Sequence, residues 1–223
     1  MKNKSLFIGS ISALAGILLV ILVLINYFLV QDSFLKYTNH KYSVHDELLM
    51  DSSELDKVVE QMVAYVKGQV NNPQVIVDIN GRQMEFFNQK ELGHLKDVLE
   101  LISDVYAWMI CLVVIFIIGE VILVKKKKYS SIINGVFIAW GIIVMLTMCV
   151  AIYAFIDINM VIDGFHMLFL GDSEWVLNPS LDRSVWMFMT DMYKDVVVAI
   201  GTIVVGTALV SMGIALVLQK KMK

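Results

Sequence analysis

Four long runs of apolar residues constrain this chain more than any other feature of its sequence. They cover about residues 7–30, 105–124, 132–156 and 196–218, and each is long enough for the roughly 20 residues that a helix needs to cross a bilayer. They raise the hydrophobic fraction to 58%, above the roughly 45–50% of a soluble domain. The sequence therefore predicts an all-α polytopic membrane protein with four transmembrane helices, organised as one integral membrane domain over residues 1–223.

The first run is predicted to be an uncleaved span and not a signal peptide. A signal peptide has an apolar region of about 7–15 residues and a small-residue cleavage site, whereas this run is longer and ends in Asn26–Val30. Small residues between Gly9 and Gly16 would let another helix approach closely.

The placement of lysines predicts the orientation in the membrane. Lysines occur before the first span, in the short loop 125–131 and at the C-terminus, whereas the large loops 31–104 and 157–195 hold nearly all the acidic residues. Because cytoplasmic segments carry the excess of Lys and Arg, we expect both termini in the cytoplasm and both large loops outside the cell. All four histidines would then be extracytoplasmic: His40, His45, His94 and His166.

The first large loop has the pattern of a folded region. Apolar residues from Leu55 to Val66 recur at helical spacing. Asp51 followed by Glu54 has the spacing of a capping box at the start of this helix, and Gly68 is suited to its end.

A hairpin and a second helix are predicted after it. Asn80-Gly81 separates two strand-like runs, and this dipeptide favours a tight hairpin because both turn residues take positive φ. Asn88 and Glu91 have the spacing of another capping box, which opens a helix that runs on into the second span. The extracytoplasmic region should thus be a small α+β unit of helix, β-hairpin and helix.

The second large loop places a histidine among large apolar side chains in Asp163–Phe169. Further along, Asn178-Pro179 suggests an N-cap with proline in the first helical turn. A short apolar helix would follow, with Trp186 near its centre.

His94 and His166 are the candidates for chemistry. Imidazole accepts or donates a proton near neutral pH without a large pKa shift. His94 and Asp97 are three residues apart on a predicted helix and so share a face, which would let the carboxylate orient the ring as in a catalytic triad. The alternatives are an interfacial histidine without a role at His166 and a solvated charged face around His94.

Other chemistries have weaker signals. There is no G-x-S-x-G motif, and Cys111 and Cys149 lie in apolar runs, where thiols are usually buried and inert and where no extracytoplasmic disulfide can form. Without H-E-x-x-H or a tight ligand pair, a metal is a minor alternative. Glu120 lies near the lysine loop, where an interfacial ion pair is expected. The basic loop is too short to indicate nucleic-acid binding. Because neither a serine motif nor an accessible cysteine is evident, the nucleophile of an enzyme of this kind would come from the substrate or from water.

One motif in each large loop carries a resemblance. The segment Lys90–Val98 reads KELGHLKDV, and the segment Ile162–Phe169 reads IDGFHMLF and is followed by Trp175 and Asn178-Pro179. They resemble the R-E-x-x-H-M-x-D-V and F-D-x-F-H-x-L-F motifs of the lipoprotein intramolecular transacylases of low-GC Gram-positive bacteria. The resemblance covers about residues 55–194, with lysine at position 90 in place of the family's arginine.

This resemblance implies an acyltransferase of the bacterial cell membrane with its site at the extracytoplasmic face. The enzyme would move the sn-2 acyl chain of a lipoprotein's diacylglyceryl-cysteine onto that cysteine's own α-amine, giving the lyso-form. Its partners would be the diacylated lipoprotein and membrane lipid, and no cofactor is implied.

For this reaction we hypothesise roles for the residues of the two motifs. The catalytic residues would be His166, as general base, and His94, as the group that stabilises the oxyanion or protonates the leaving oxygen, although the two could be exchanged. No covalent enzyme intermediate is expected. Supporting residues would be Asp97, Asp163 and Glu91, and the substrate-binding candidates are Phe165, Phe169, Trp175 and Asn178. The competing functions are a membrane hydrolase that uses water, with or without a metal, and a non-enzymatic membrane sensor or chaperone.

Overall fold

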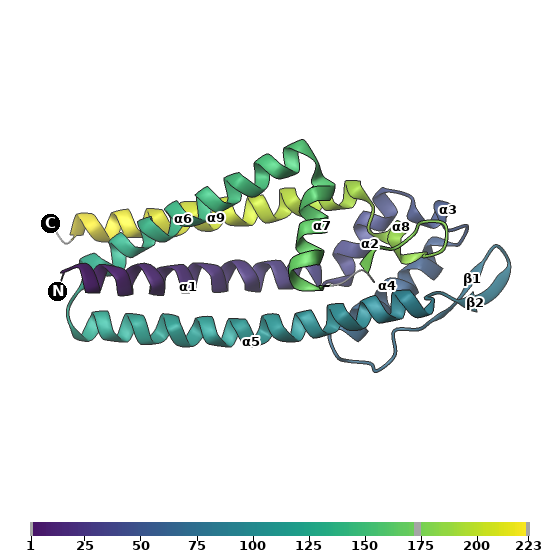
Figure 1. Cartoon of the computed structure of the whole chain (residues 1–223), viewed down its shortest axis with the longest axis horizontal. Helices are drawn as coiled ribbons and strands as arrows, with labels where there is room; N and C mark the ends of the chain where they lie inside the picture. The colour runs from purple at the N-terminus through teal and green to yellow at the C-terminus, as the bar shows by residue number, and fades with distance from the viewer. Residues whose placement is uncertain (1, 172–174, 222–223) are drawn as a thin grey trace. The chain divides into compact units, whose positions relative to one another are not determined.

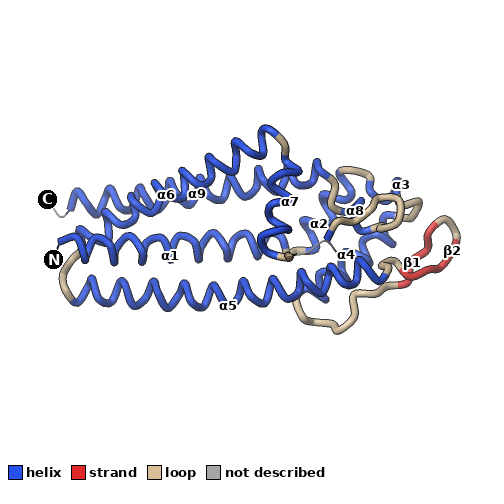
Figure 2. The backbone as a smooth tube through the Cα atoms, in the orientation of Figure 1, coloured by secondary structure: helices blue, strands red, loops and turns tan. Residues whose placement is uncertain are grey.

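The computed structural model describes residues 2–171 and 175–221, except the side chains of Lys2, Phe28, Leu29 and Thr190. Met222 and Lys223, part of the lysine-rich C-terminus, lie outside the described residues. Figures 1 and 2 show a helical chain with one small hairpin. The helices and strands are α1 (Lys2–Leu29), α2 (Asp32–Lys41), α3 (Val44–Glu47), α4 (Ser52–Val66), β1 (Ile76–Ile79), β2 (Arg82–Glu85), α5 (Gln89–Lys125), α6 (Tyr129–Ile156), α7 (Ile158–Phe169), α8 (Ser184–Met187) and α9 (Thr190–Lys221).

The predicted fold class is confirmed. Within the described residues, α1, α5, α6 and α9 each contain a stretch long and apolar enough to cross a membrane. The chain divides into two compact units. We call them the span unit (Met1–Ile25, Val105–Asp157 and Val197–Lys223) and the loop unit (Asn26–Asp104 and Ile158–Val196). The arrangement of residues 1–223 as a single integral membrane domain stays a prediction.

In the span unit, small residues bring the helix backbones together. A Cβ atom on Gly135 of α6 would lie 2.3 Å from the carbonyl oxygen of Gly9 on α1, and one on Gly9 would lie 2.2 Å from the carbonyl oxygen of Ser131. On α5, a Cβ atom on Gly119 would lie 2.6 Å from Cβ of Ser12. The close approach predicted from the small residues of the first span is therefore confirmed.

The carboxylate of Glu120 in α5 pairs with a hydroxyl of α1. Ser12 Oγ donates a hydrogen bond to Glu120 Oε1 over 2.6 Å, and Ser12 is 1% exposed. No ion pair joins Glu120 to a lysine among the described residues, so the expected pair with the lysine loop is wrong. The hydroxyl satisfies the carboxylate because the backbones of α1 and α5 lie close enough at this point.

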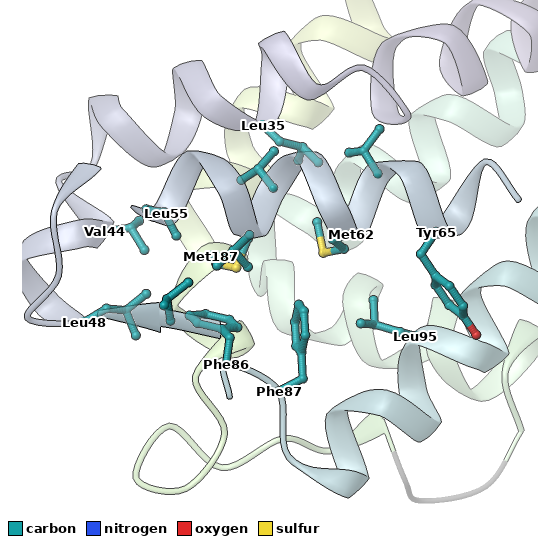
Figure 3. Close-up of a cluster of buried hydrophobic side chains, with 14 of the residues drawn as sticks. Leu35, Val44, Leu48, Leu55, Met62, Tyr65, Phe86, Phe87, Leu95 and Met187 are labelled. Atoms are coloured by element: carbon teal, nitrogen blue, oxygen red, sulfur yellow. The ribbon is translucent and has the colours of Figure 1, made fainter. Parts of the chain in front are cut away.

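The loop unit has a core of its own (Figure 3). The apolar face of α4 is buried as predicted, with Val58 and Val59 both 0% exposed. The hairpin contributes Val77 and Phe86, also 0% exposed, and the second loop contributes Met187 at 1%. Each fully buried apolar side chain stabilises the fold by roughly 1.5–3 kcal/mol, so this unit is held by a packed interior.

Helix α4 lacks the predicted cap at its start but ends at the predicted glycine. Asp51 makes no side-chain cap at the start of α4. Glu54 instead pairs with Lys57 and accepts the N–H of Asp78 over 3.2 Å, and these hydrogen bonds lower the pKa of Glu54. The predicted capping box is therefore wrong, because Glu54 is used to hold the hairpin. Gly68 ends the helix with a φ of 68°, as predicted.

The predicted hairpin is confirmed. Strands β1 and β2 pair antiparallel, with Ile79 opposite Arg82, and they are the only strands in the described part of the chain (Figure 2). Asn80 and Gly81 have φ values of 53° and 78°, so both turn residues are left-handed, as a two-residue turn of this type requires.

The second loop differs from its prediction at Asn178. The main-chain N–H of Ser180 bonds to Asn178 Oδ1 over 2.9 Å, and the N–H of Leu181 bonds to the carbonyl oxygen of Asn178 over 2.9 Å. Asn178 thus caps a turn, not a helix. The short apolar helix exists as α8 but begins only at Ser184, because the side chain of Asn178 closes the turn first.

Candidate active site

A reciprocal capping box fixes the start of α5, the helix that carries His94. The N–H of Glu91 bonds to Asn88 Oδ1 over 3.0 Å, and the N–H of Asn88 bonds to Glu91 Oε2 over 2.7 Å. These are the two hydrogen bonds that the sequence pattern predicts. They set where α5 begins and therefore the direction in which its first turns present their side chains.

Glu91 also joins the two large loops. Its side chain is fully buried, and Oε1 accepts the N–H of Ser184 over 2.6 Å. The main-chain amide at the start of α8 is thereby tied to the start of α5. A carboxylate in this position is satisfied on both oxygens, which is what a buried charged group requires.

A second buried carboxylate, which sequence reasoning missed, strengthens this tie. Asp182 is 4% exposed and accepts hydrogen bonds from Asn88 Nδ2 over 2.7 Å and from the N–H of Asn178 over 2.6 Å. Burial alone would raise its pKa, but these hydrogen bonds and the charge of Lys90 outweigh burial and lower the pKa of Asp182. Lys90 also donates to the carbonyl oxygen of Val176.

Arg183 ties the hairpin to the same segment and was also missed. Its Nη1 donates to the carbonyl oxygens of Glu85 and Phe86 over 3.2 and 3.0 Å. The signal for both residues was the charged pair Asp182-Arg183 in an otherwise apolar stretch. Residues 172–174, which belong to the predicted second loop, lie outside the described residues.

His94 lies one turn after Glu91 and is half-buried. Its Nδ1 is buried and has no hydrogen-bond partner in the described structure. His94 precedes the predicted span 105–124. Burial lowers the pKa of the imidazole, the nearby His166 lowers it further, and Asp97 acts in the opposite direction with the smallest effect. The neutral ring is therefore favoured.

His166 comes from α7 and lies against His94. The two ring centroids are 5.8 Å apart, with an angle of 29° between the ring planes. His166 Nδ1 lies 2.7 Å from the carbonyl oxygen of Ile162. Because a carbonyl oxygen only accepts, Nδ1 carries the proton in the neutral ring, and Nε2 keeps its lone pair. This is the form that a general base needs.

Aromatic side chains surround His166. Trp175 stacks on the ring with centroids 4.6 Å apart and planes at 24°. Phe165 meets it edge-on at 5.7 Å, and Phe165 and Phe169 lie 4.9 Å apart. The structure thus brings together His94, His166, Trp175, Phe165 and Phe169 of the predicted site residues.

The other predicted residues lie differently. In the described structure no hydrogen bond or ion pair joins Asp97 or Asp163 to a histidine, and Asp163 is exposed. Their orienting roles stay predictions. Glu91 and Asn178 belong to the network that joins the loops and make no ring contact with the histidines.

The remaining histidines form a separate pair. His40 Nε2 lies 2.9 Å from Asp56 Oδ1, and the rings of His40 and His45 are 6.2 Å apart. No group of three or more metal-ligating side chains with the geometry of a metal site occurs among the described residues. Cys111 and Cys149 are free and exposed thiols, so the expectation that they are buried is wrong.

Comparisons with known proteins agree with this picture. The model of the family described as "Lipoprotein intramolecular transacylase Lit" matches residues 10–193, whereas no curated protein sequence matches the chain. A solved structure of the membrane integral lipoprotein intramolecular transacylase Lit from Bacillus cereus is similar, with a TM-score of 0.75 and 16% identity over 100% of this chain and 99% of that one.

Two histidine variants of the Bacillus cereus protein are similar as well. The structure with histidine changed to arginine has a TM-score of 0.71 and 18% identity, over 99% of this chain and 93% of that one. The structure with histidine changed to alanine has a TM-score of 0.73 and 16% identity, over 100% and 96%. At these identities the structures show a shared fold. Because the family model covers most of the sequence, the chain belongs to the lipoprotein intramolecular transacylase family.

Proposed function

We propose that this transacylase moves the sn-2 acyl chain of a lipoprotein's diacylglyceryl-cysteine onto the α-amine of the same cysteine. The observation that carries the proposal is the stacking of His94 on His166, two histidines far apart in the sequence, in a chain that belongs to this family. Donor and acceptor are parts of one molecule, so the main task of the site is to hold them together. Such positioning can supply several kcal/mol of the barrier.

His166 is the general base in this proposal. An α-amine has a pKa of about 7.7–8.0 and is largely protonated at neutral pH. Nε2 of His166 has a free lone pair, because Nδ1 is engaged with the carbonyl oxygen of Ile162. The ring first takes one proton from the ammonium and releases it to solvent, and the neutral nitrogen then attacks the ester carbonyl carbon. A second proton leaves the nitrogen after the attack, and the ring accepts it. The nucleophile is thus supplied by the substrate. Trp175 stacks on the imidazole of His166 and limits its rotation.

His94 acts on the oxygen side of the ester. A buried ring nitrogen without a hydrogen-bond partner is uncommon in folded proteins, and Nδ1 of His94 is one. We assign this nitrogen to a substrate oxygen, either the oxyanion of the tetrahedral intermediate or the glycerol oxygen that leaves. The neutral ring, which burial and His166 favour, can carry its hydrogen on Nδ1 and donate it to that oxygen.

The reaction balances without a cofactor. A bond forms between the α-nitrogen and the acyl carbon, and the bond from that carbon to the sn-2 oxygen breaks. The proton that the nitrogen loses after the attack ends on the glycerol oxygen, and the one that the ammonium loses before it goes to solvent. The two rings lie 5.8 Å apart, centroid to centroid, so that His166 can take the proton on the amine side while His94 gives one on the alcohol side.

The site lies outside the cell in this proposal. The lysines of the 125–131 loop and of the chain ends support a cytoplasmic location for those segments. Asn80→Cys and Lys127→Cys, each in a chain with Cys111→Ser and Cys149→Ser, would be treated in intact cells with an impermeant maleimide. Labelling at position 80 and not at 127 is expected, and the reverse pattern would overturn the orientation.

Mass spectrometry of a synthetic diacylglyceryl lipopeptide tests the reaction. The full-length protein in proteoliposomes should yield a product of unchanged mass whose fragments carry one acyl chain on the cysteine nitrogen. A peptide with an acetylated α-amine is the matched control, because it has no acceptor and should remain unchanged. Loss of an acyl chain from both peptides would instead show a hydrolase, and no change in either would leave the sensor or chaperone.

Two further readouts bear on the finer claims. A mixture of peptides with light and heavy acyl chains should give no crossed product if transfer is intramolecular. Intact-protein mass spectrometry during turnover should show no acyl adduct. An adduct would overturn direct attack by the amine.

A further inference from the structure

Helix α7, which carries His166, has no buried side chain in any of its 12 residues. Helices of this length rarely hold their shape in water without packing. No α7 residue belongs to either apolar cluster formed by the described residues, not even as a partly buried neighbour. Among the described residues, neither apolar cluster thus covers the apolar side of α7, the helix labelled in Figure 1.

The two faces of α7 are chemically distinct. At 100° per residue, Asn159, Asp163 and His166 fall within one narrow arc. The opposite arc holds only apolar residues and glycine, and its large side chains are open: Leu168 is 74% exposed, Phe165 47% and Phe169 41%. A helix of this kind lies at a boundary between a polar and an apolar phase.

The position of α7 in the chain identifies the apolar phase. A single residue, Asp157, separates it from the end of α6, which is one of the four helices able to cross a membrane. Its first turn is therefore at the level where a span leaves the hydrocarbon. The charge of α7 argues against headgroup attraction, because its only formal charge is the negative Asp163. The apolar side of α7 is therefore expected to contact the acyl chains and not the charged headgroups.

We infer that α7 lies in the plane of the membrane interface, with the arc of Phe165, Leu168 and Phe169 among the acyl chains of the bilayer. His166 lies at the edge of the polar arc, next to Ile162 at the border of the apolar one. The helix thereby holds the imidazole at the depth of the glycerol esters. This last step rests on the proposed function, whereas the location of the helix does not.

The location can be measured without catalysis. A nitroxide label would be placed by Leu168→Cys or by Asp163→Cys in the full-length chain with Cys111→Ser and Cys149→Ser, in phosphatidylcholine nanodiscs. Electron paramagnetic resonance then compares relaxation by oxygen, which collects in hydrocarbon, with relaxation by a water-soluble nickel chelate. The two positions lie on the same helix, so each is the control for the other.

The label at 168 should be relaxed mainly by oxygen and the label at 163 mainly by nickel, with a several-fold difference in their ratio. Val161→Cys, also on the apolar arc, repeats the test if Leu168→Cys does not fold. Equal access of nickel at 163 and at the apolar positions would overturn the inference. So would a membrane contact that appears only when anionic lipid is added. Failure of the proposed reaction would show instead as absence of the N-acyl product, with the labels unaffected.

Discussion

His94 and His166 lie beside each other, but the helices that carry them are supported in different ways. His94 follows a buried capping box and precedes Leu95, which is 6% exposed and part of the loop unit's core. His166 is on a helix without a buried residue. Half of the candidate site is thus fixed by a protein interior, whereas the other half is on a helix whose apolar side, we infer, lies in the bilayer.

If α7 lies in the bilayer as inferred, the difference lets a membrane enzyme hold its reacting groups in place and still admit a lipid. A site enclosed by protein core on all sides would have to open for a substrate with two acyl chains. A site with one wall on a lipid-facing helix can receive the substrate from the membrane, while the rigid wall keeps the reacting groups aligned.

The largest effects should come from the histidines themselves. His94→Ala and His166→Ala should each lower the initial rate of N-acyl product formation by about 10²–10⁴-fold, the usual range for a general acid or base. The double variant should be little worse than either single variant, because groups that act as a unit are not additive. The rate would be followed by mass spectrometry in proteoliposomes.

His40→Ala is the control for these variants, because it removes a part-exposed contact with Asp56 and a ring contact with His45, neither of which involves His94 or His166. It should keep nearly full activity. Full activity of either His94→Ala or His166→Ala would remove that residue from the mechanism, and a double loss equal to the product of the single losses would show that the two act independently.

Two phenylalanines test the difference in support directly. Phe86→Ala should lower the free energy of unfolding by about 3–5 kcal/mol, because it opens a cavity in a closed core. Phe165→Ala, at a side chain 47% exposed, should cost less than about 1 kcal/mol. Thermal unfolding in one detergent compares them, and equal losses would mean that α7 is packed as firmly as the hairpin.

Glu91→Gln should have an intermediate effect. The amide keeps the shape of the side chain but has one oxygen for the two N–H groups of Asn88 and Ser184, so one buried N–H faces another donor. The expected cost is about 1–3 kcal/mol, with a lower rate because the start of α5 shifts. Glu100→Gln, exposed on the same helix, should change neither the melting temperature nor the rate, and an equal drop there would indicate a general charge effect.

The smallest effect concerns pH. Burial, with His166, lowers the pKa of folded His94 below its ordinary value of 6.5. The unfolded chain then binds a proton more readily than the folded one. His94 therefore favours the folded state above about pH 6.5, and this contribution is lost as the pH falls toward the lower, folded pKa.

The melting temperatures of the parent and His94→Gln, measured between pH 8 and pH 5, isolate this contribution. The parent should lose slightly more stability on acidification than the variant, because all other groups titrate in both. An identical decline in the two proteins would show that the pKa of His94 is not lowered by folding.

Much of the fold could be predicted because its signals are local. Span length, the left-handed Asn80-Gly81 turn and the reciprocal bonds of Asn88 and Glu91 each depend on a few neighbouring residues. The capping box at Asp51 failed for the opposite reason. Glu54 has partners outside its own turn, in Lys57 and in the backbone of Asp78, and a local pattern does not record such competition.

The candidate site could be predicted in its residues but not in its support. The two histidine motifs stood out in the sequence, whereas the roles of Asp182 and Arg183 depend on the hairpin and the second loop meeting in space. The hydrogen bond from Nδ1 of His166 to the carbonyl oxygen of Ile162, four residues earlier, also could not be predicted from the spacing of the histidines. This bond depends on the helical geometry of α7, which brings residues four apart onto one face.

The hydrogen bond between Ser12 and Glu120 has a consequence for the way the protein is made. A carboxylate within an apolar span makes the insertion of that helix less favourable, by about 2.5–3.5 kcal/mol at the centre of the span, and Glu120 lies nearer the end. The first span leaves the ribosome well before the second, so the hydroxyl is already in the bilayer when the carboxylate arrives. We expect Glu120 to form its hydrogen bond with Ser12 as the second span enters the bilayer. The order of synthesis then helps the helices of the bundle to assemble.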